Sequence, residues 1–164
     1  MRAWSYANGF RRSRRLPGIV ISVGNLTVGG TGKTPFVIWL AKKLLERGQH
    51  VAVLTRGYRG TFRGILRGRL PEQFANRPEA MSALSDETLI IHSSLAQQPN
   101  AEWNFAMGVG ADRFASGSEL GIAGFDWFVL DDGFQHLQLA RDLDLVRGRG
   151  GLAVLGVGAY PDRA

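Results

Sequence analysis

Short apolar runs alternate with amphipathic stretches along this chain, and the alternation predicts a sheet with helices packed on it. Residues 19–23 are continuously apolar and rich in β-branched side chains, which is typical of a buried strand. Apolar positions then recur near i, i+4 and i+8 from Pro35 to Arg47, which predicts a helix that Gly48 ends. A second apolar run, residues 51–55, follows. A strand, a helix and a strand of these lengths indicate a right-handed parallel βαβ unit.

The rest of the chain repeats this alternation less regularly. Apolar runs predict strands over residues 103–109, 126–130 and 142–146. Residues 111–123 are expected to form a helix that two glycines weaken, and residues 71–84 a loop with a short helix. We therefore expect an α/β fold with a doubly wound, mostly parallel sheet and flanking helices.

The turn between the first predicted strand and the first predicted helix is rich in glycine. A phosphate loop binds phosphate through inward-pointing backbone N–H groups and the positive end of the following helix. In such a loop Lys33 is expected to reach the β- and γ-phosphates, and the Thr34 hydroxyl to ligate Mg²⁺. The strand-to-helix setting favours this P-loop NTPase-like interpretation over a chance glycine-rich turn, although threonine replaces the first glycine of the motif. The loop reads Thr27-Val28-Gly29-Gly30-Thr31-Gly32-Lys33-Thr34.

Two adjacent carboxylates, Asp131 and Asp132, follow the apolar run at residues 126–130. Enzymes with phosphate loops place a carboxylate at a strand tip as a second Mg²⁺ contact, and the metal offsets the repulsion between paired acids. A polar turn after a strand is the structural alternative. Two more acids lie in the stretch Ser85-Asp86-Glu87-Thr88, where a helix N-cap followed by an acidic first turn explains them without any chemistry.

The charge balance favours anionic partners. The chain carries 20 Lys and Arg against 14 Asp and Glu, a net charge of +6, which suits nucleotides, nucleic acids and lipid phosphates alike. Residues 1–16 combine five arginines with Trp4, Tyr6 and Phe10, the composition of an interfacial membrane helix, although a basic tail or a helix packed on the core fits as well. Arg56 follows the second predicted strand at the edge where ligands bind, and faces either phosphate or solvent.

Length and composition set the remaining bounds. A chain of 164 residues is most simply one domain, and it can bury roughly 70% of its unfolded surface. The absence of cysteine excludes disulfides and cysteine-based zinc sites, and it suits a cytosolic enzyme. No apolar run approaches the ~18 residues of a membrane span, and no signal peptide is expected.

Four segments of the chain resemble the lipid A 4'-kinase (tetraacyldisaccharide 4'-kinase) family. The first surrounds the phosphate loop, and the fourth contains Asp131-Asp132-Gly133-Phe134-Gln135-His136. These two are specific and lie far apart in the sequence, so together they are more telling than a phosphate loop alone. The resemblance extends from about residue 17 to 146 and is carried by residues 23–35, 55–58, 108–113 and 129–144.

The resemblance implies an ATP-dependent kinase that uses Mg²⁺. Its expected acceptor is a lipid A disaccharide precursor, a tetraacylated glucosamine disaccharide 1-phosphate, which receives the γ-phosphoryl group on its 4'-hydroxyl and becomes lipid IVA. The resemblance also implies a peripheral location at the cytoplasmic face of the Gram-negative inner membrane. There residues 1–16 would bind the anionic membrane surface, and no nucleic-acid partner is expected.

The family's functional residues carry over to positions that match its motifs. Lys33 and Thr34 are expected to contact phosphate and metal, and Asp131 and Asp132 to form the acidic pair near Mg²⁺. The family has a Gly-Asp-Glu-Pro segment whose aspartate is the base for the sugar hydroxyl, and Asp86 is its counterpart here. A carboxylate suits that role because positioning and electrostatics dominate phosphoryl transfer.

The chain departs from the family after residue 146. We expect a basic helix over residues 1–16, a kinase core lobe over 17–146 and an atypical tail over 147–164 where family members continue into a second, lipid-binding lobe. A truncated nucleotide-binding remnant without catalysis is therefore one alternative. A P-loop ATPase of the partitioning or metal-chaperone type is another, disfavoured because Val28 occupies a position where many of those proteins have lysine.

Overall fold

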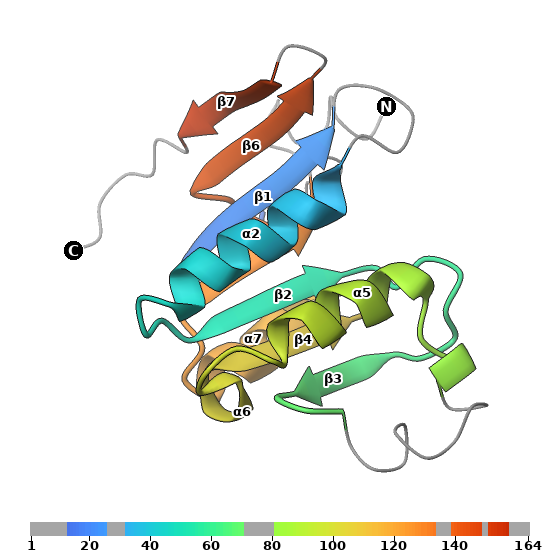
Figure 1. Ribbon diagram of the computed structural model, residues 1–164. Helices are drawn as coiled ribbons and strands as arrows, with labels where there is room; N and C mark the ends of the chain where they lie inside the picture. Colours follow the sequence, from blue (N-terminus) through green and yellow to red (C-terminus); the bar gives the residue numbers. More distant parts are fainter. Residues whose placement is uncertain (1–12, 26–31, 71–80, 134–138, 149–150, 158–164) are drawn as a thin grey trace.

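The structure is a computed structural model that describes residues 13–25, 32–70, 81–133, 139–148 and 151–157. Within these residues seven strands form one sheet (Figure 1). The strands are β1 (Ile19–Asn25), β2 (Val51–Thr55), β3 (Gly64–Arg67), β4 (Phe105–Val109), β5 (Trp127–Asp131), β6 (Leu143–Gly148) and β7 (Gly151–Val157).

The sheet has the order β3-β4-β2-β5-β1-β6-β7. The five inner strands are mutually parallel, and the two edge strands β3 and β7 pair antiparallel with β4 and β6. The carboxyl ends of the inner strands therefore meet at one edge of the sheet, which we call the carboxyl end. The predicted mostly parallel α/β architecture is confirmed.

Helices cover both faces of the sheet, as the doubly wound prediction requires. Helices α2 (Lys33–Leu45) and α5 (Asp86–Leu95) lie side by side on one face, and α7 (Arg113–Ile122) packs on the other (Figure 1). Strand β2 is buried along its whole length, and its successive side chains alternate between two hydrophobic clusters, one on each face. A short helix, α6 (Ala101–Asn104), leads into β4.

Several predicted element boundaries move in the structure. Helix α2 begins at Lys33 rather than at Pro35, because Gly32 (φ 76°) occupies the cap position and Pro35 falls within the first turn. Trp103 was predicted to start a strand but belongs to α6, and β4 begins at Phe105. Strand β3 was not predicted; it has four residues, of which only Leu66 is buried.

The chain segment before β1 runs along α7. A Cβ atom on Gly117 would lie 2.5 Å from Leu16 Cδ1, and one on Gly121 would lie 2.5 Å from Pro17 Cγ, so the two glycines of α7 permit this close approach. Arg14 accepts a 2.8 Å hydrogen bond from Ala140 N through its carbonyl oxygen.

The side chain of Arg14 lies at the start of α7. Its guanidinium is 3.3 Å from Asp112, the N-cap of α7, and lies over the Phe114 ring. Since α7 follows the carboxyl end of β4, Arg14 lies at the carboxyl end of the sheet, and the chain runs from there along α7 to the start of β1. Residues 13–16 are not helical, and the remainder of the helix predicted over 1–16 lies outside the described residues. Among the described residues, no helix is both long and apolar enough to cross a membrane.

Candidate active site

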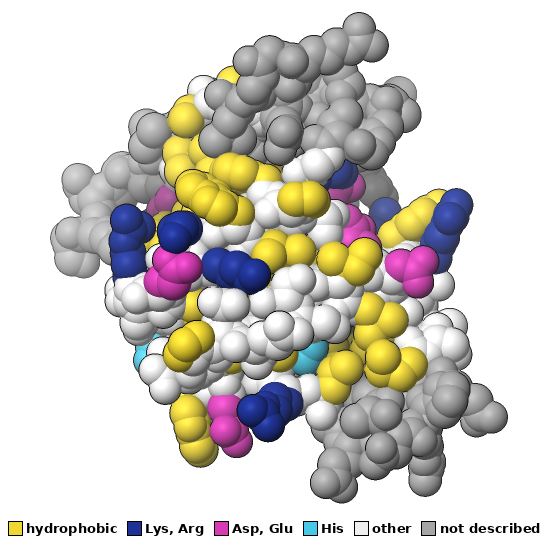
Figure 2. All heavy atoms as spheres, viewed as in Figure 1, with side chains coloured by type: hydrophobic (Ala, Val, Ile, Leu, Met, Phe, Trp, Pro, Cys, Tyr) yellow, Lys and Arg dark blue, Asp and Glu magenta, His cyan; other side chains and the backbone are white. Residues whose placement is uncertain are grey.

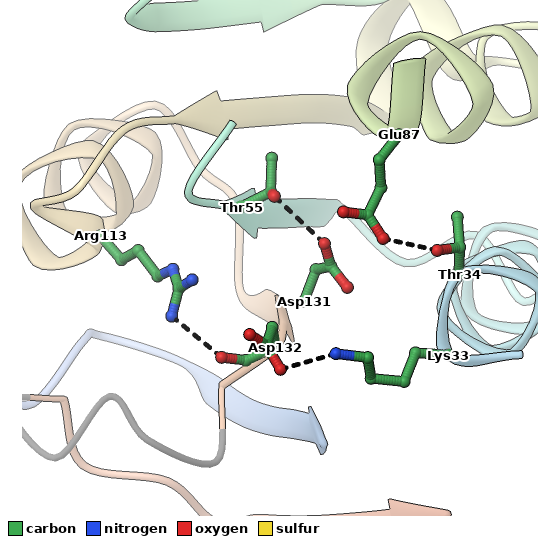
Figure 3. Close-up of polar contacts among 7 residues, drawn as sticks. All are labelled: Lys33, Thr34, Thr55, Glu87, Arg113, Asp131 and Asp132. Atoms are coloured by element: carbon green, nitrogen blue, oxygen red, sulfur yellow. Dashed lines mark hydrogen bonds and ion pairs between the residues drawn. The ribbon is translucent and has the colours of Figure 1, made fainter. Parts of the chain in front are cut away.

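Polar side chains from five elements converge at the carboxyl end of the sheet. Figure 3 shows them: the start of α2, the ends of β2 and β5, and the first turns of α5 and α7 each contribute. Four of the residues predicted from the sequence are brought together here, namely Lys33, Thr34, Asp131 and Asp132. The predicted loop residues Thr27, Val28, Gly29, Gly30 and Thr31 lie outside the described residues.

Asp132 pairs with the phosphate-loop lysine. Its carboxylate oxygen Oδ1 accepts a 2.7 Å hydrogen bond from Lys33 Nζ, and its carbonyl oxygen accepts a 3.4 Å bond from Arg113 Nη1. The backbone of Asp132 is left-handed (φ 51°), and a Cβ on Gly133 would lie 2.7 Å from Ser22 Oγ. This tight turn against β1 therefore fixes the direction in which Asp132 presents its side chain.

Asp131 is a buried carboxylate with one oxygen atom that has no partner among the described residues. Its side chain is 2% exposed, its Oδ2 accepts a 3.1 Å hydrogen bond from Thr55 Oγ1, and its Oδ1 has no hydrogen-bond partner among the described residues. Burial, reinforced by the charge of Glu87, raises the pKa of Asp131 to about 6, against the opposing effects of Thr55 and Lys33. A cation bound at Oδ1 would offset this cost.

Glu87, rather than Asp86, faces the other site residues. Glu87 Oε1 accepts a 2.6 Å hydrogen bond from Thr34 Oγ1, whereas Asp86 is exposed at the same helix turn. Ser85 caps this turn, because its Oγ accepts a 3.3 Å bond from Thr88 N, so the structural interpretation of this stretch is correct for Ser85. Sequence reasoning gave Glu87 no role.

The oxygen ligands at the site fit Mg²⁺ better than a softer metal. Two carboxylates, Asp131 and Glu87, and the Thr34 hydroxyl face one another (Figure 3). No group of three or more His, Cys, Asp or Glu side chains suited to a metal occurs within the described ranges. Mg²⁺ needs no such cage, because it keeps several waters and binds one or two carboxylates together with substrate phosphates.

Arg113 supplies a buried positive charge that sequence reasoning missed. It lies in the first turn of α7, is 5% exposed, and its Nε has no hydrogen-bond partner within the described part of the chain. Burial lowers the pKa of Arg113, while the charges of Asp131 and Asp132 oppose that shift. A cation directly after an N-cap opposes the helix dipole, and this was the available signal for a special role.

Comparisons with known proteins point to one family. The family model described as "Tetraacyldisaccharide-1-P 4'-kinase" matches residues 1–147. The tetraacyldisaccharide 4'-kinase of Geobacter sulfurreducens is 40% identical over 147 residues, which are 89% of this chain and 39% of that protein. The Syntrophobacter fumaroxidans protein of the same name is 44% identical over 138 residues, 84% of this chain and 33% of that protein.

A solved structure agrees with these sequence matches. The "apo" form of LpxK from Aquifex aeolicus, in complex with ATP, superposes with a TM-score of 0.67 at 36% identity, covering 88% of this chain and 42% of that one. The present chain thus spans about two fifths of the length of the relatives it matches. The resemblance inferred from the phosphate loop and the Asp-Asp pair is confirmed.

Proposed function

The chain belongs to the tetraacyldisaccharide-1-P 4'-kinase family, and on that premise we propose that it transfers the γ-phosphoryl group of ATP to a lipid acceptor. The acceptor is a tetraacyl glucosamine disaccharide 1-phosphate, and the product is lipid IVA, phosphorylated at the 4'-hydroxyl. The observation that carries the proposal is the convergence of Lys33, Thr34 and Asp131 at the carboxyl end of a parallel sheet. Family membership disfavours a partitioning-type ATPase.

Lys33 and the acidic residues would divide the work of binding MgATP. Lys33, which is paired with Asp132, would contact the phosphates, and Thr34, Asp131 and Glu87 would hold Mg²⁺. The metal supplies positive charge that offsets the charge on the transferring phosphoryl group. Arg113, whose charge faces Asp131 and Asp132, keeps this acidic edge in place when Lys33 turns to phosphate.

Asp86 would act as the base for the acceptor. It is exposed beside Glu87 in the first turn of α5. The carboxylate takes the proton of the 4'-hydroxyl as the oxygen bonds to the γ-phosphorus, and the bond to the bridging oxygen breaks and releases ADP. Asp86 and Glu87, though adjacent in sequence, thus have different roles.

We further propose that the carboxyl end of the sheet faces the cytoplasmic side of the inner membrane. The described residues from Arg14 to Pro17 run beside α7, with Arg14 at this end of the sheet, and the basic and aromatic residues 1–12 precede them in the sequence. A sequence of this composition would bind an anionic lipid surface and bring the site to a lipid-borne acceptor. The lobe boundaries predicted at residues 16 and 146 remain predictions. Strand β7, which lies within the predicted tail, pairs with β6, which begins in the predicted core lobe.

A lipid phosphorylation assay with labelled ATP tests the proposal. Wild-type chain is compared with Lys33→Ala, Asp86→Ala and the matched control Lys43→Ala, an exposed lysine paired with Glu46 on the same helix. We expect transfer in the wild type and control and none in the other two variants. ATP binding without transfer in the wild type would refute the kinase activity and leave a nucleotide-binding module.

The same assay separates the roles of the two adjacent acids. Asp86→Asn should abolish transfer while ATP affinity stays within about twofold, because a base contributes to the chemical step alone. Glu87→Gln should raise the Mg²⁺ concentration needed for half-maximal ATP binding. The opposite pattern would reverse the two assignments.

A further inference from the structure

The loop after β2 carries an exposed aromatic and cationic pair beside the candidate active site. Residues 57–60 form a β-turn closed by a 3.1 Å hydrogen bond from Gly60 N to Gly57 O, with Tyr58 and Arg59 at its two central positions. The Tyr58 side chain is 69% exposed, and the Arg59 guanidinium carbon lies 5.5 Å from the centre of its ring. The turn therefore presents a flat apolar face and a positive charge together.

This turn is held in place by the surrounding backbone. A Cβ on Gly57 would lie 2.5 Å from Val109 Cγ1, and one on Gly60 would lie 2.7 Å from Ser85 N. Gly57 N also donates to Thr55 Oγ1, the hydroxyl that donates to Asp131. The turn thus lies between Asp131, a proposed Mg²⁺ ligand, and Ser85, the N-cap residue that immediately precedes Asp86.

The backbone of the turn is strained where Arg59 lies. Arg59 has a φ of 66°, at a turn position that favours glycine because a side chain there is crowded. Strained residues of this kind tend to occur at functional sites, where the surrounding structure over-determines the conformation. The arginine at this position therefore costs backbone strain, and a role as a solvent-exposed loop residue does not explain that cost.

Resting on the proposed function, we infer that Tyr58 and Arg59 bind the sugar-phosphate headgroup of the acceptor. The Tyr58 ring packs against the apolar face of a sugar, and the Arg59 guanidinium binds the acceptor's phosphate. The close approach of Gly60 to Ser85 N places the turn next to the residue before Asp86, the proposed base for the acceptor hydroxyl. The ATP phosphates belong to the Lys33 side, on α2.

Binding of soluble headgroup analogues tests this inference without requiring turnover. The full chain, loaded with a non-hydrolysable ATP analogue, is titrated with glucosamine disaccharide 1-phosphate and with the same disaccharide lacking phosphate. The variants are Tyr58→Ala and Arg59→Asn, since asparagine tolerates a positive φ. Trp103→Ala is the matched control, a 74% exposed aromatic at the opposite end of the sheet.

The two variants should fail in different ways. Tyr58→Ala should weaken both ligands by about tenfold, and Arg59→Asn should weaken only the phosphorylated one, by about tenfold. Trp103→Ala should bind as the wild type, and ATP affinity should stay within about twofold throughout. Wild-type affinity of both variants for both ligands, or no binding by the wild-type chain, would overturn the inference.

Two further measurements keep this inference separate from its premise. Loss of headgroup binding in the variants, in a chain that transfers no phosphate to lipid, would refute the proposed activity and support the pair as a binding site. Unchanged KM for the lipid in both variants of an active chain would refute the pair alone. Vesicles of phosphatidylglycerol without acceptor should bind all variants equally; a loss confined to vesicles would instead show a general membrane contact.

Discussion

The two ends of the parallel strands treat buried polar groups differently. At the amino end Trp127 Nε1 donates a 2.7 Å hydrogen bond to Gln49 Oε1, and His50 O accepts from two backbone N–H groups. His92, beside the first residue of β4, keeps an unpartnered Nε2 within the described structure, but burial lowers the pKa of His92 to about 4, so its ring is neutral. At the carboxyl end two charged groups, Asp131 and Arg113, each keep an atom without a partner among the described residues, as does the neutral hydroxyl of Ser22.

On the proposed function, this difference marks where the fold gives up stability for binding. An unpaired atom on a buried neutral ring costs about 1–3 kcal/mol, whereas an ionised group buried without a full set of partners costs more. On the proposed function, MgATP would complete the charges at the carboxyl end. Figure 2 shows scattered rather than clustered charge on the helical face between these two ends. The following changes are ordered from the largest expected effect to the smallest.

Replacing Asp131 should have opposite effects on activity and stability. We expect Asp131→Asn to lower phosphoryl transfer by about 10³-fold, because a metal contact is lost. Because the folded-state pKa is raised, the stability that Asp131 contributes is present below about pH 3.8 and lost as the pH rises through about 6.

The unfolding free energy of Asp131→Asn should therefore exceed that of wild type by about 1–3 kcal/mol at pH 8. Near pH 4 the two proteins should be equally stable. Urea unfolding of the nucleotide-free proteins at both pH values measures this. A variant that is less stable at pH 8 would show that the Asp131 charge is satisfied in the free protein.

Removing Mg²⁺ should weaken the carboxyl end alone. At MgATP concentrations of 100 Kd the wild type should gain about 2.7 kcal/mol in unfolding free energy. EDTA should remove most of this gain, and Lys33→Ala should abolish it, whereas Lys43→Ala should retain it. Thermal unfolding with and without the chelator provides the measurement, and equal gains in both lysine variants would contradict the phosphate contact.

Acidification should destabilise the amino end. The lowered pKa of His92 means that the unfolded chain takes up the proton first, so its contribution is present above about pH 6.5 and is lost as the pH falls toward 4. We expect wild type to lose about 2 kcal/mol more than His92→Leu across this window. Parallel pH slopes for the two proteins would rule out the buried neutral ring, and ATP binding at pH 8 should be unchanged.

The smallest effect is expected at Trp103. Although large, this side chain is 74% exposed on α6, so Trp103→Ala should change the unfolding free energy by less than about 0.5 kcal/mol. ATP affinity should be unaffected. Chemical denaturation and nucleotide titration check both, and a larger loss would show that the Trp103 side chain packs against the rest of the fold.

The sequence predicted the inner sheet well because its strands are continuous apolar runs. Strands β1, β2 and β5 were placed within two residues, since strands buried on both faces leave an unmistakable hydrophobic signature. Strand β3 left no such signature, because it pairs at an edge and buries only Leu66. Its position depends on pairing with β4, which lies far along the chain.

The positions of two site residues, Glu87 and Arg113, could not be inferred from the sequence alone. Asp86 and Glu87 are adjacent acids, and the one that faces Thr34 is set by the phase of a helix that Ser85 begins. Arg113 is unfavourable at the start of its own helix. The nearby charge of Asp131, at the end of β5, stabilises its positive charge. Lys33, Thr34 and the aspartate pair could be predicted from the sequence because these residues belong to short motifs that need no tertiary information.

The position of β1 has a consequence for how the chain folds as it is made. The strand leading into the phosphate loop leaves the ribosome early, but its two neighbours, β5 and β6, are synthesised more than a hundred residues later. Strands β2 and β4 can pair sooner. The apolar β1 therefore stays without its pairing partners until almost all the described sheet has been translated. During that time it is exposed to chaperones and to misassembly. Nucleotide binding would then be the last property that the nascent protein acquires.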